Sequence, residues 1–419
     1  MVPRLTTTTV DLAPLLLVGW QMVLPISELQ HLPAVLAVVA TVMMARHVAR
    51  ELRSKRERVL ILGTGPMAVK LVEEIEAARP PKYVVAGVVD DEAPEADSPL
   101  ARHWLGACDE LARIVKDATP ASIVLAAADR RSRLPLQSLL EARVRGIGVE
   151  DALEFYERLT GKIAIEALRP SVLIMSKGFR NHGPAETTAR VVSMFVAVVG
   201  LIVCAPLLAL LALLVKLDSR GPVFFYQQRA GRDGQPFGLI KFRTMHPTDA
   251  PPSEWVSDNI HRITRVGRWL RRFRLDELPQ LVNVLRGEMN LIGPRPHPVS
   301  NHSTFTERIA YYALRSSVRP GVTGWAQVRY GYANNLEEET VKMRFDLFYI
   351  KNRSLLLDTR IMFETVGIML FGTGASEVRR PSPSRSALVP SAAIRGAAEE
   401  TAVVRWIPTP TTSSSTGPH

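Results

Sequence analysis

The chain has little cysteine and lacks the spacings that mark several common protein classes. Only two cysteines are present, Cys108 and Cys204, one in a polar region and one in an apolar run. Cysteines placed so far apart argue against a disulfide and fit a reducing compartment. The sequence has no zinc-finger spacing, no aromatic motif typical of RNA-binding domains and no internal repeat. These absences argue against a nucleic-acid partner.

Acidic residues are outnumbered by basic ones. Lys and Arg total 52 and Asp and Glu total 41, so the net charge is +11. A basic chain can bind nucleic acid or an anionic membrane, and the hydrophobic fraction of 47%, gathered in long uncharged runs, favours the membrane. A length of 419 residues is enough for two or three domains with cores of their own.

Residues 1–50 are predicted to form an N-terminal membrane region. Its two apolar segments, 10–25 and 32–48, are each shorter than the roughly 20 residues of a spanning helix and contain or adjoin prolines. A tight hairpin, a single marginal span and a surface-lying anchor all remain open. A signal peptide is disfavoured, because the first residues carry little charge and no cleavage site follows. The basic run after this region places the following residues in the cytoplasm.

A third apolar segment, 191–217, is long enough to span a membrane. Pro206 lies in its middle, where it removes a backbone hydrogen bond and bends a helix. Neither half could cross about 30 Å of hydrocarbon alone. Basic residues flank both ends, among them Arg190 at the start, so both ends are expected in the cytoplasm. We predict a re-entrant helical hairpin over 190–217 with its apex at Pro206; a straight span with a tolerated proline is the alternative.

Residues 51–180 alternate between strand and helix patterns. Arg58–Leu62 reads as a buried strand, a glycine-rich turn leads into a helix, and the strand Tyr83–Val89 ends at an acid. This order predicts a Rossmann-like, doubly wound domain. Pro66 removes an N–H that could face a pyrophosphate, so a structural or regulatory role is favoured over a catalytic one. The candidate nucleotide-binding residues are Gly63, Gly65 and Asp90.

An acidic pair, Asp276-Glu277, follows an arginine-dense helical pattern in the C-terminal half. Neighbouring guanidinium groups keep a carboxylate ionised, and they match phosphate oxygens in shape. The pair therefore indicates a centre that handles phosphates. The alternative is a solvated helix surface with ordinary ion pairs. The helix expected over Arg262–Arg274 is amphipathic and suits either a lipid headgroup layer or a protein core.

Four stretches around this pair resemble one family. They are KFRTM from Lys241, LDELPQLVNVLRGEMNLIGPRP from Leu275, RPGVTGWAQV from Arg319 and DLFYIKNRSLLLD from Asp346. In this order they resemble the bacterial sugar transferases, the monotopic polyprenyl-phosphate phosphoglycosyl transferases of the undecaprenyl-phosphate glucose or galactose phosphotransferase type. Residues 51 to about 180 resemble the Rossmann-like domain of the larger exopolysaccharide-building members. Those members usually begin with four transmembrane helices, which residues 1–50 do not provide.

The resemblance implies an enzyme that transfers a substituted phosphate group. Asp276 would attack the sugar-bearing phosphorus of a UDP-sugar, form a covalent aspartyl-phosphosugar and release UMP. Glu277 would hold Mg²⁺, which bridges diphosphate oxygens. Polyprenyl phosphate would then accept the sugar 1-phosphate, which starts the exopolysaccharide repeat unit. The implied substrate-binding residues are Lys241, Arg243, Arg271, Arg272, Arg274, Pro294, Arg295, Pro296, Arg319 and Asp346.

The expected architecture is an α/β membrane protein at the cytoplasmic face of the bacterial inner membrane, in contact with lipids. A Rossmann-like domain (51–180) precedes a mixed α/β catalytic domain (187–375) anchored by the re-entrant hairpin, and residues 376–419 read as a disordered tail. A homo-oligomer is compatible with the sequence. Two other functions stay open: a nucleotide-sugar oxidoreductase or epimerase that uses the Rossmann-like unit, and a non-enzymatic membrane adaptor.

Overall fold

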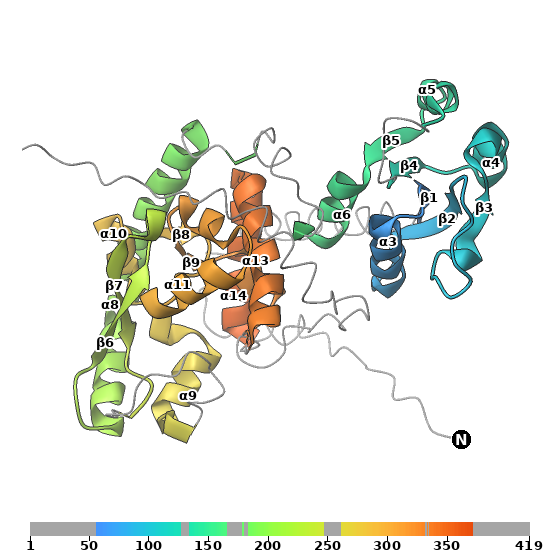
Figure 1. The fold of residues 1–419 in the computed structure, drawn as a ribbon. Helices are drawn as coiled ribbons and strands as arrows, with labels where there is room; N and C mark the ends of the chain where they lie inside the picture. The colour runs from blue at the N-terminus through green and yellow to red at the C-terminus, as the bar shows by residue number, and fades with distance from the viewer. Residues whose placement is uncertain are drawn as a thin grey trace, which may run out of the picture.

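The computed structural model describes residues 56–126, 134–165, 178–179, 183–246, 261–331, 333 and 335–371. The apolar segments expected within residues 1–50 and the tail expected over 376–419 lie outside the described residues. Figure 1 shows two bodies, one built on a parallel sheet and one built around a bundle of helices with short strand pairs.

The first body is a five-stranded parallel sheet in the order β3-β2-β1-β4-β5. This order matches the first five strands of the 3-2-1-4-5-6 doubly wound sheet, the fold class that the sequence predicted. The short strand β3 was not anticipated. The strands are β1 (Glu57–Leu62), β2 (Tyr83–Val89), β3 (Trp104–Gly106), β4 (Ser122–Leu125) and β5 (Gly148–Asp151), and the helices are α3 (Pro66–Ala77), α4 (Leu111–Ala118), α5 (Leu136–Val144) and α6 (Ala152–Thr160).

Helices cover both faces of this sheet. Along β1, Val59 and Ile61 pack with α3 and α6, while the alternate residues Leu60 and Leu62 pack with α4 and α5. A strand buried on both faces needs an apolar side chain at every position, which is why this segment reads as an unbroken apolar run. Two short 3₁₀ turns, η2 (Ala101–His103) and η3 (Cys108–Glu110), flank β3.

A single long helix, α8 (Pro184–Asp218), leads into the second body. It spans 35 residues, about 52 Å at 1.5 Å per residue, and Pro206 lies inside it. The stretch Glu186–Asp218 contains an 18-residue window with a mean hydropathy of 3.0 and is long enough to cross a membrane. Helical structure continues through Pro206, so the two-armed hairpin predicted from the sequence is not shown.

One stripe of α8 packs on the second body and the rest of its surface is exposed. Ser193 and Ala197, and further along Leu211 and Val215, form two buried pairs with one helical turn within each pair, whereas large apolar side chains on the other sides stand free of protein. The exposed set includes Phe195, Ile202, Val203, Leu210, Leu213 and Leu217. An apolar surface of this extent marks a membrane or protein contact.

The second body combines two strand pairs with a helical core. The antiparallel pair β6 (Phe224–Ala230) and β7 (Pro236–Phe242) is joined through η5 (Arg232–Gly234). The parallel pair is β8 (Asn290–Ile292) and β9 (Gly321–Thr323). Around them lie α9 (Arg265–Arg272), η7 (Leu275–Glu277), α10 (Gln280–Arg286), α11 (Val299–Arg308), η8 (Tyr312–Ser317), α12 (Trp325–Arg329), α13 (Leu336–Lys351) and α14 (Leu355–Phe371).

The two bodies touch where the end of α6 meets α12 and α13. Ile163 N–H donates to the carbonyl of Arg344 at 3.1 Å, and the side chain of Ile163 joins the core of the second body. Lys351 forms an ion pair with the buried Glu157 at 2.8 Å. Helix α13 is therefore held directly by the sheet domain.

Candidate active site

The acidic pair lies in η7, the single 3₁₀ turn between α9 and α10. Arg274 precedes it in a left-handed conformation (φ 54°), which breaks α9 and turns the chain before Leu275. Asp276 and Glu277 are only 8% and 7% exposed. The alternative in which the pair decorates a solvated helix is therefore wrong, because water reaches neither carboxylate freely.

Glu277 is the member of the pair that is held in its charged form. Arg295 Nη2 donates to Glu277 Oε1 at 2.7 Å, and Lys241 Nζ lies 3.7 Å from the same oxygen. Burial alone would raise the pKa of Glu277, but Arg295, Lys241 and Arg274 outweigh it and bring the pKa below its ordinary value. Residues from β7, η7 and the loop after β8 thus meet at one carboxylate oxygen.

Asp276 differs from its neighbour because no side chain among the described residues is hydrogen-bonded or ion-paired to it. Burial, and then the adjacent Glu277, raises the pKa of Asp276; Lys241, Arg271 and Arg295 act against this rise through space. The result is a buried carboxylate with nearby positive charge and with its oxygens uncommitted. A nucleophile that must approach a diphosphate needs these two properties.

Unpaired donors gather near the pair. Arg271 Nη1 and Arg274 Nε are buried without a hydrogen-bond partner in the part of the chain that the structure describes. Burial, together with Arg295, lowers the pKa of Lys241 to about 8, so its amine titrates near neutrality. Buried guanidinium donors that lack an acceptor suit an anionic ligand such as a diphosphate.

The loop that carries Arg295 is held by its backbone. The carbonyl of Pro294 accepts from Gly321 N–H at 2.9 Å, that of Arg295 from Arg315 Nη2 at 2.6 Å, and that of Pro296 from Arg229 Nη1 at 2.9 Å. Three successive carbonyls are therefore engaged from β9, η8 and β6, so the Pro-Arg-Pro loop is rigid for reasons beyond its prolines. Sequence reasoning missed both Arg229 and Arg315, whose neighbours carry no phosphate-binding pattern.

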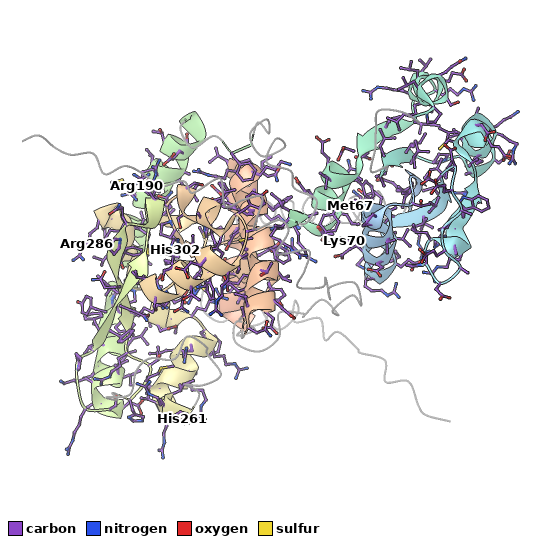
Figure 2. All side chains as sticks on the ribbon, in the orientation of Figure 1. Met67, Lys70, Arg190, His261, Arg286 and His302 are labelled. Carbon is purple, nitrogen blue, oxygen red and sulfur yellow. The ribbon has the colours of Figure 1, made fainter. Side chains whose placement is uncertain are left out.

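Two of the arginines expected to bind substrate make their contacts with α8. Arg243 Nη2 donates to the carbonyl and hydroxyl of Ser219 at 2.7 and 2.9 Å, directly after the end of α8. Arg319 Nη1 pairs with Glu186 at 2.9 Å in the first turns of α8. Arg190, the basic residue at the start of the apolar segment, donates to the carbonyl of Met289 at 2.9 Å, close to the end of α10 that carries Arg286 (Figure 2). These contacts fasten both ends of α8 to the second body.

Two predicted substrate-binding residues remain: Asp346 contacts the site through another residue, and Arg272 lies at its edge. Asp346 on α13 is buried and accepts from Arg315 Nε at 2.6 Å, so it reaches the site only through Arg315. The guanidinium of Arg272 lies over the ring of Phe273, with 5.6 Å to the centroid.

A buried polar network lies beside the Pro-Arg-Pro loop. His297 Nε2 lies 3.2 Å from Glu339 Oε1, and Lys342 lies 3.5 Å from the other oxygen of that carboxylate. Burial lowers the pKa of His297 to about 3, so the imidazole is neutral near pH 7. His297 follows the Pro-Arg-Pro loop, and its side chain packs on the buried Glu339.

The donor set suits Mg²⁺ bound together with substrate. The described residues contain no group of three His, Cys, Asp or Glu side chains that could hold a metal by themselves. Mg²⁺ is usually held by one or two carboxylates plus substrate phosphates and water. The adjacent carboxylates of Asp276 and Glu277 match that pattern.

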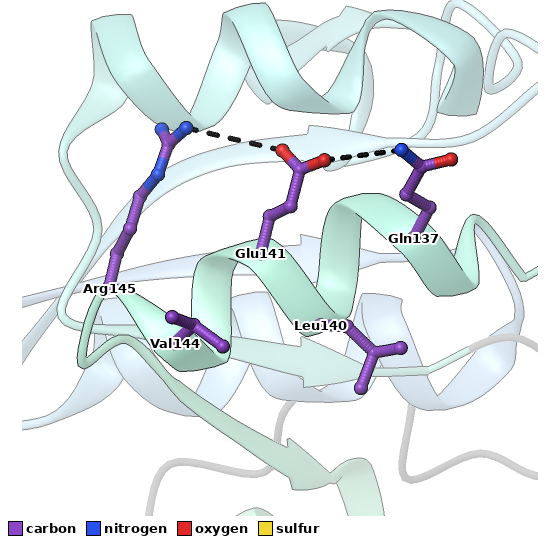
Figure 3. A pocket seen from close by; sticks show the side chains of 5 residues that line it. All are labelled: Gln137, Leu140, Glu141, Val144 and Arg145. Atoms are coloured by element: carbon purple, nitrogen blue, oxygen red, sulfur yellow. Dashed lines mark hydrogen bonds and ion pairs between the residues drawn. The ribbon is translucent and has the colours of Figure 1, made fainter.

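The glycine-rich turn of the sheet domain is hydrogen-bonded to an acidic side chain of the same domain, Asp90. Thr64 N–H and Thr64 Oγ1 both donate to Asp90 Oδ2, at 2.7 and 2.6 Å, between the candidate residues Gly63 and Gly65. Pro66 begins α3, so the first helical N–H is missing. A shallow pocket in this domain lies on α5, far along the chain from the turn, and is lined by Gln137, Leu140, Glu141, Val144 and Arg145 (Figure 3).

Comparison with known proteins agrees with the geometry of the second body. A model of the family "Bacterial sugar transferase" matches residues 185–372, which include α8, the acidic pair and the Pro-Arg-Pro loop. A UDP-glucose:undecaprenyl-phosphate glucose-1-phosphate transferase of Caulobacter vibrioides is 42% identical over 211 residues, 48% of this chain and 78% of that one. The chain belongs to the bacterial sugar transferase family.

Two relatives show how far the similarity extends. An undecaprenyl-phosphate glucose phosphotransferase of Komagataeibacter xylinus is 31% identical over 362 residues, 81% of this chain and 62% of that one. A UDP-N-acetylgalactosamine-undecaprenyl-phosphate N-acetylgalactosaminephosphotransferase of Aeromonas hydrophila is 40% identical over 221 residues, 52% of this chain and 51% of that one. The chain thus spans between half and two thirds of the length of these two sugar transferases.

Proposed function

We propose that this bacterial sugar transferase moves a sugar 1-phosphate from a UDP-sugar to undecaprenyl phosphate and so starts an exopolysaccharide repeat unit. The observation that carries the proposal is the contrast within the acidic pair. Glu277 is fixed and charged between Arg295 and Lys241, while the oxygens of the buried Asp276 next to it have no side-chain partner among the described residues. The names of the relatives supply the substrate class, and the geometry supplies the residue to which the chemistry is assigned.

The first step is attack by an Asp276 carboxylate oxygen on the phosphorus that bears the sugar. An O–P bond forms to Asp276, the P–O bond to UMP breaks, and UMP leaves with the bonding electrons. Lys241, Arg271, Arg274 and Arg295 supply the positive charge that lets one anion approach another. Mg²⁺ held by Glu277 would contribute further charge neutralisation at the diphosphate.

In the second step, a phosphate oxygen of the lipid attacks the same phosphorus and displaces the Asp276 carboxylate. The aspartate is regenerated, and the sugar becomes linked to the lipid through a diphosphate. Splitting the transfer lets one small site receive an aqueous donor and a lipid acceptor in turn. Because the same arginines neutralise both phosphates, no second cationic site is needed.

The location proposed for this chemistry is the cytoplasmic face of the bacterial inner membrane. Both ends of α8 are fastened to the same folded body, through Glu186 with Arg319 and through Asp218 with the N–H of Val266 at 3.0 Å. A helix whose ends are held by one body on one side of a membrane cannot leave an end on the other side. We therefore propose that α8 dips into one leaflet and returns, with Pro206 as the place where it bends.

The test is UMP release by the full chain in membranes or nanodiscs with Mg²⁺, undecaprenyl phosphate and a panel of UDP-sugars. The panel includes UDP-glucose, UDP-galactose and UDP-N-acetylgalactosamine. We expect one or more sugars to support turnover in the wild type, and Asp276→Asn to abolish it. Mass spectrometry of the peptide that contains Asp276, after incubation without lipid, should show an added sugar phosphate. Wild-type rates in Asp276→Asn would overturn the covalent mechanism.

Two alternatives give different outcomes in the same material. An oxidoreductase or epimerase would change nicotinamide absorbance or fluorescence when cofactor is added. The occupied turn at Asp90 and the proline at position 66 give that alternative no support. A membrane adaptor without enzymatic activity would release no UMP and would keep its biological output in Asp276→Asn.

A further inference from the structure

Two arginines hold the Pro294–Pro296 loop, the half-buried Arg229 and the buried Arg315, and neither belongs to the sequence motifs of the site. Arg229 on β6 donates to the carbonyl of Pro296, and Arg315 on η8 donates to that of Arg295. The Arg295 side chain itself reaches Glu277 Oε1. The peptide that carries the phosphate-facing guanidinium is thus fixed by other guanidiniums.

Arg315 makes three hydrogen bonds to protein groups, one of which holds the carbonyl of Arg295. Its Nε donates to Asp346 Oδ2 at 2.6 Å, its Nη1 to the Tyr312 hydroxyl at 3.1 Å and its Nη2 to the Arg295 carbonyl at 2.6 Å. The residue is 5% exposed. Each of the three nitrogens donates to a protein acceptor, so the buried guanidinium is held in place by protein contacts on three sides.

The position of Arg295 depends on this contact. The 2.6 Å hydrogen bond from Arg315 fixes the carbonyl group of Arg295. The carbonyl carbon is bonded to the Cα atom that carries the Arg295 side chain, so fixing the one also places the other. If the peptide moves, the 2.7 Å bond between Arg295 Nη2 and Glu277 lengthens and a charged donor leaves the diphosphate site. A misplacement of about 1 Å in a positioning group can cost on the order of 100-fold in rate.

We propose that Arg315 is a positioning residue of the transfer reaction. It holds the backbone of Arg295 so that the Arg295 guanidinium meets Glu277, and Asp346 on α13 orients Arg315 for that task. The role rests on the proposed function, because it assigns Arg315 to the site at which the UDP-sugar reacts.

The kinetic test compares Arg315→Met, Arg295→Met and the double variant in UMP release. Arg315→Met should lower kcat/KM by about 100-fold. Because Arg315 acts through Arg295, the double variant should lose no more than about threefold beyond Arg295→Met alone. Fully additive losses would show that Arg315 acts independently of Arg295, and they would overturn the proposal. Arg308→Met, an exposed arginine of α11, is the matched control and should keep the wild-type rate.

Hydrogen exchange supplies a readout that does not need turnover. In Arg315→Met, exchange should accelerate in the peptide covering residues 291–298 and remain unchanged in α8, α10 and the sheet domain. Arg315→Lys keeps the charge but cannot bond Asp346 and the Arg295 carbonyl together, so it should give an intermediate acceleration in the same peptide. Unchanged exchange in that peptide for a folded Arg315→Met chain would overturn the proposal.

Asp346→Asn tests the same contact if Arg315→Met does not fold. The amide keeps the volume of the carboxylate but loses the charge that orients Arg315, so exchange in 291–298 should rise and the loss in rate should again not add to that of Arg295→Met. Wild-type exchange and rate in Asp346→Asn would contradict the proposal. If the wild type itself releases no UMP with any UDP-sugar, the proposed function fails, while the exchange experiment still decides whether Arg315 holds the loop.

Discussion

Trp325 Nε1 donates to the carbonyl of Gly161 at 2.9 Å, across the contact between the two bodies. Gly161 ends α6 of the sheet domain in a left-handed conformation (φ 69°), and Trp325 begins α12 of the transferase body. The indole also stacks on Arg329, whose guanidinium lies 4.2 Å from the ring centroid. A tryptophan of the RPGVTGWAQV motif thus docks onto the other domain.

Gly161→Ala should weaken this docking. A Cβ at Gly161 would lie 3.0 Å from the Trp325 ring, and the left-handed backbone adds strain to any residue with a side chain. We expect a loss of about 2 kcal/mol, visible as a lower midpoint of thermal unfolding and faster proteolysis between the domains. Trp325→Phe keeps a ring but loses the donor, so it should lose about 1 kcal/mol. An unchanged midpoint in Gly161→Ala would contradict the contact.

Lys351→Met should destabilise the same contact in a pH-dependent way. Burial raises the pKa of Glu157 even though Lys351 acts to lower it. Removing Lys351 raises that pKa further. Ionising Glu157 in the folded protein then costs more stability, and this cost grows as pH rises above about 4.3, the ordinary pKa of glutamate. We expect a loss of about 2 kcal/mol at pH 7.5 and a smaller loss at pH 5, measured by thermal unfolding. Glu157→Gln combined with Lys351→Met should recover most of it.

Amide replacements in the acidic pair should change stability in opposite directions. The raised pKa of Asp276 means that its ionised form costs stability at pH 7, so Asp276→Asn should stabilise by about 1 kcal/mol, a gain that vanishes below about pH 4. The lowered pKa of Glu277 means that its ionised form stabilises the fold at pH 7. Glu277→Gln should therefore destabilise, by about 2 kcal/mol, because Arg295 and Lys241 lose their partner. Thermal unfolding across pH 4–8 measures both, and shifts of the same sign at pH 7 would contradict the assignment.

Binding of the UDP-sugar should weaken at alkaline pH. The pKa of Lys241 is lowered to about 8, so the amine loses its positive charge as pH rises through that value. The KM for the UDP-sugar should increase above pH 8, and Lys241→Arg should remove this increase because a guanidinium stays charged. Steady-state UMP release between pH 6.5 and 9.5 provides the measurement. An identical alkaline rise in KM in Lys241→Arg would assign it to another group.

Arg243→Met and Arg271→Met should separate a structural arginine from a substrate-binding one. Arg243 Nη2 is bonded to Ser219 at the end of α8, and its charge is not among those that shift the pKa of Asp276, so its loss should lower the unfolding midpoint and leave KM within about threefold of the wild type. Arg271 lowers the pKa of Asp276 through space and has a buried donor without a partner among the described residues, so its loss should raise KM by about 10-fold or more with little effect on unfolding. The reverse pattern would return Arg243 to the substrate site.

The parts of the site that are local in sequence could be predicted, and the distant parts could not. Asp276, Glu277, Arg271 and Arg274 lie within seven consecutive positions, so any compact turn brings them together. Lys241 and Arg243 are two positions apart, and strand periodicity would place both on one face. Strand β7 ends at Phe242, however, so only Lys241 keeps that orientation and Arg243 turns to α8.

By itself, the sequence determined the parallel sheet domain, the apolar helix and the acidic pair, because each depends on short-range periodicity, apolar content or adjacent charge. Tertiary structure alone decided how the pair divides its charge, since the pKa values of Asp276 and Glu277 depend on burial and on cations from β7 and the Pro-Arg-Pro loop. It also decided that Arg315 and Trp325 matter, because hydrogen bonds across 20 and 164 positions follow from chain folding and have no local signature.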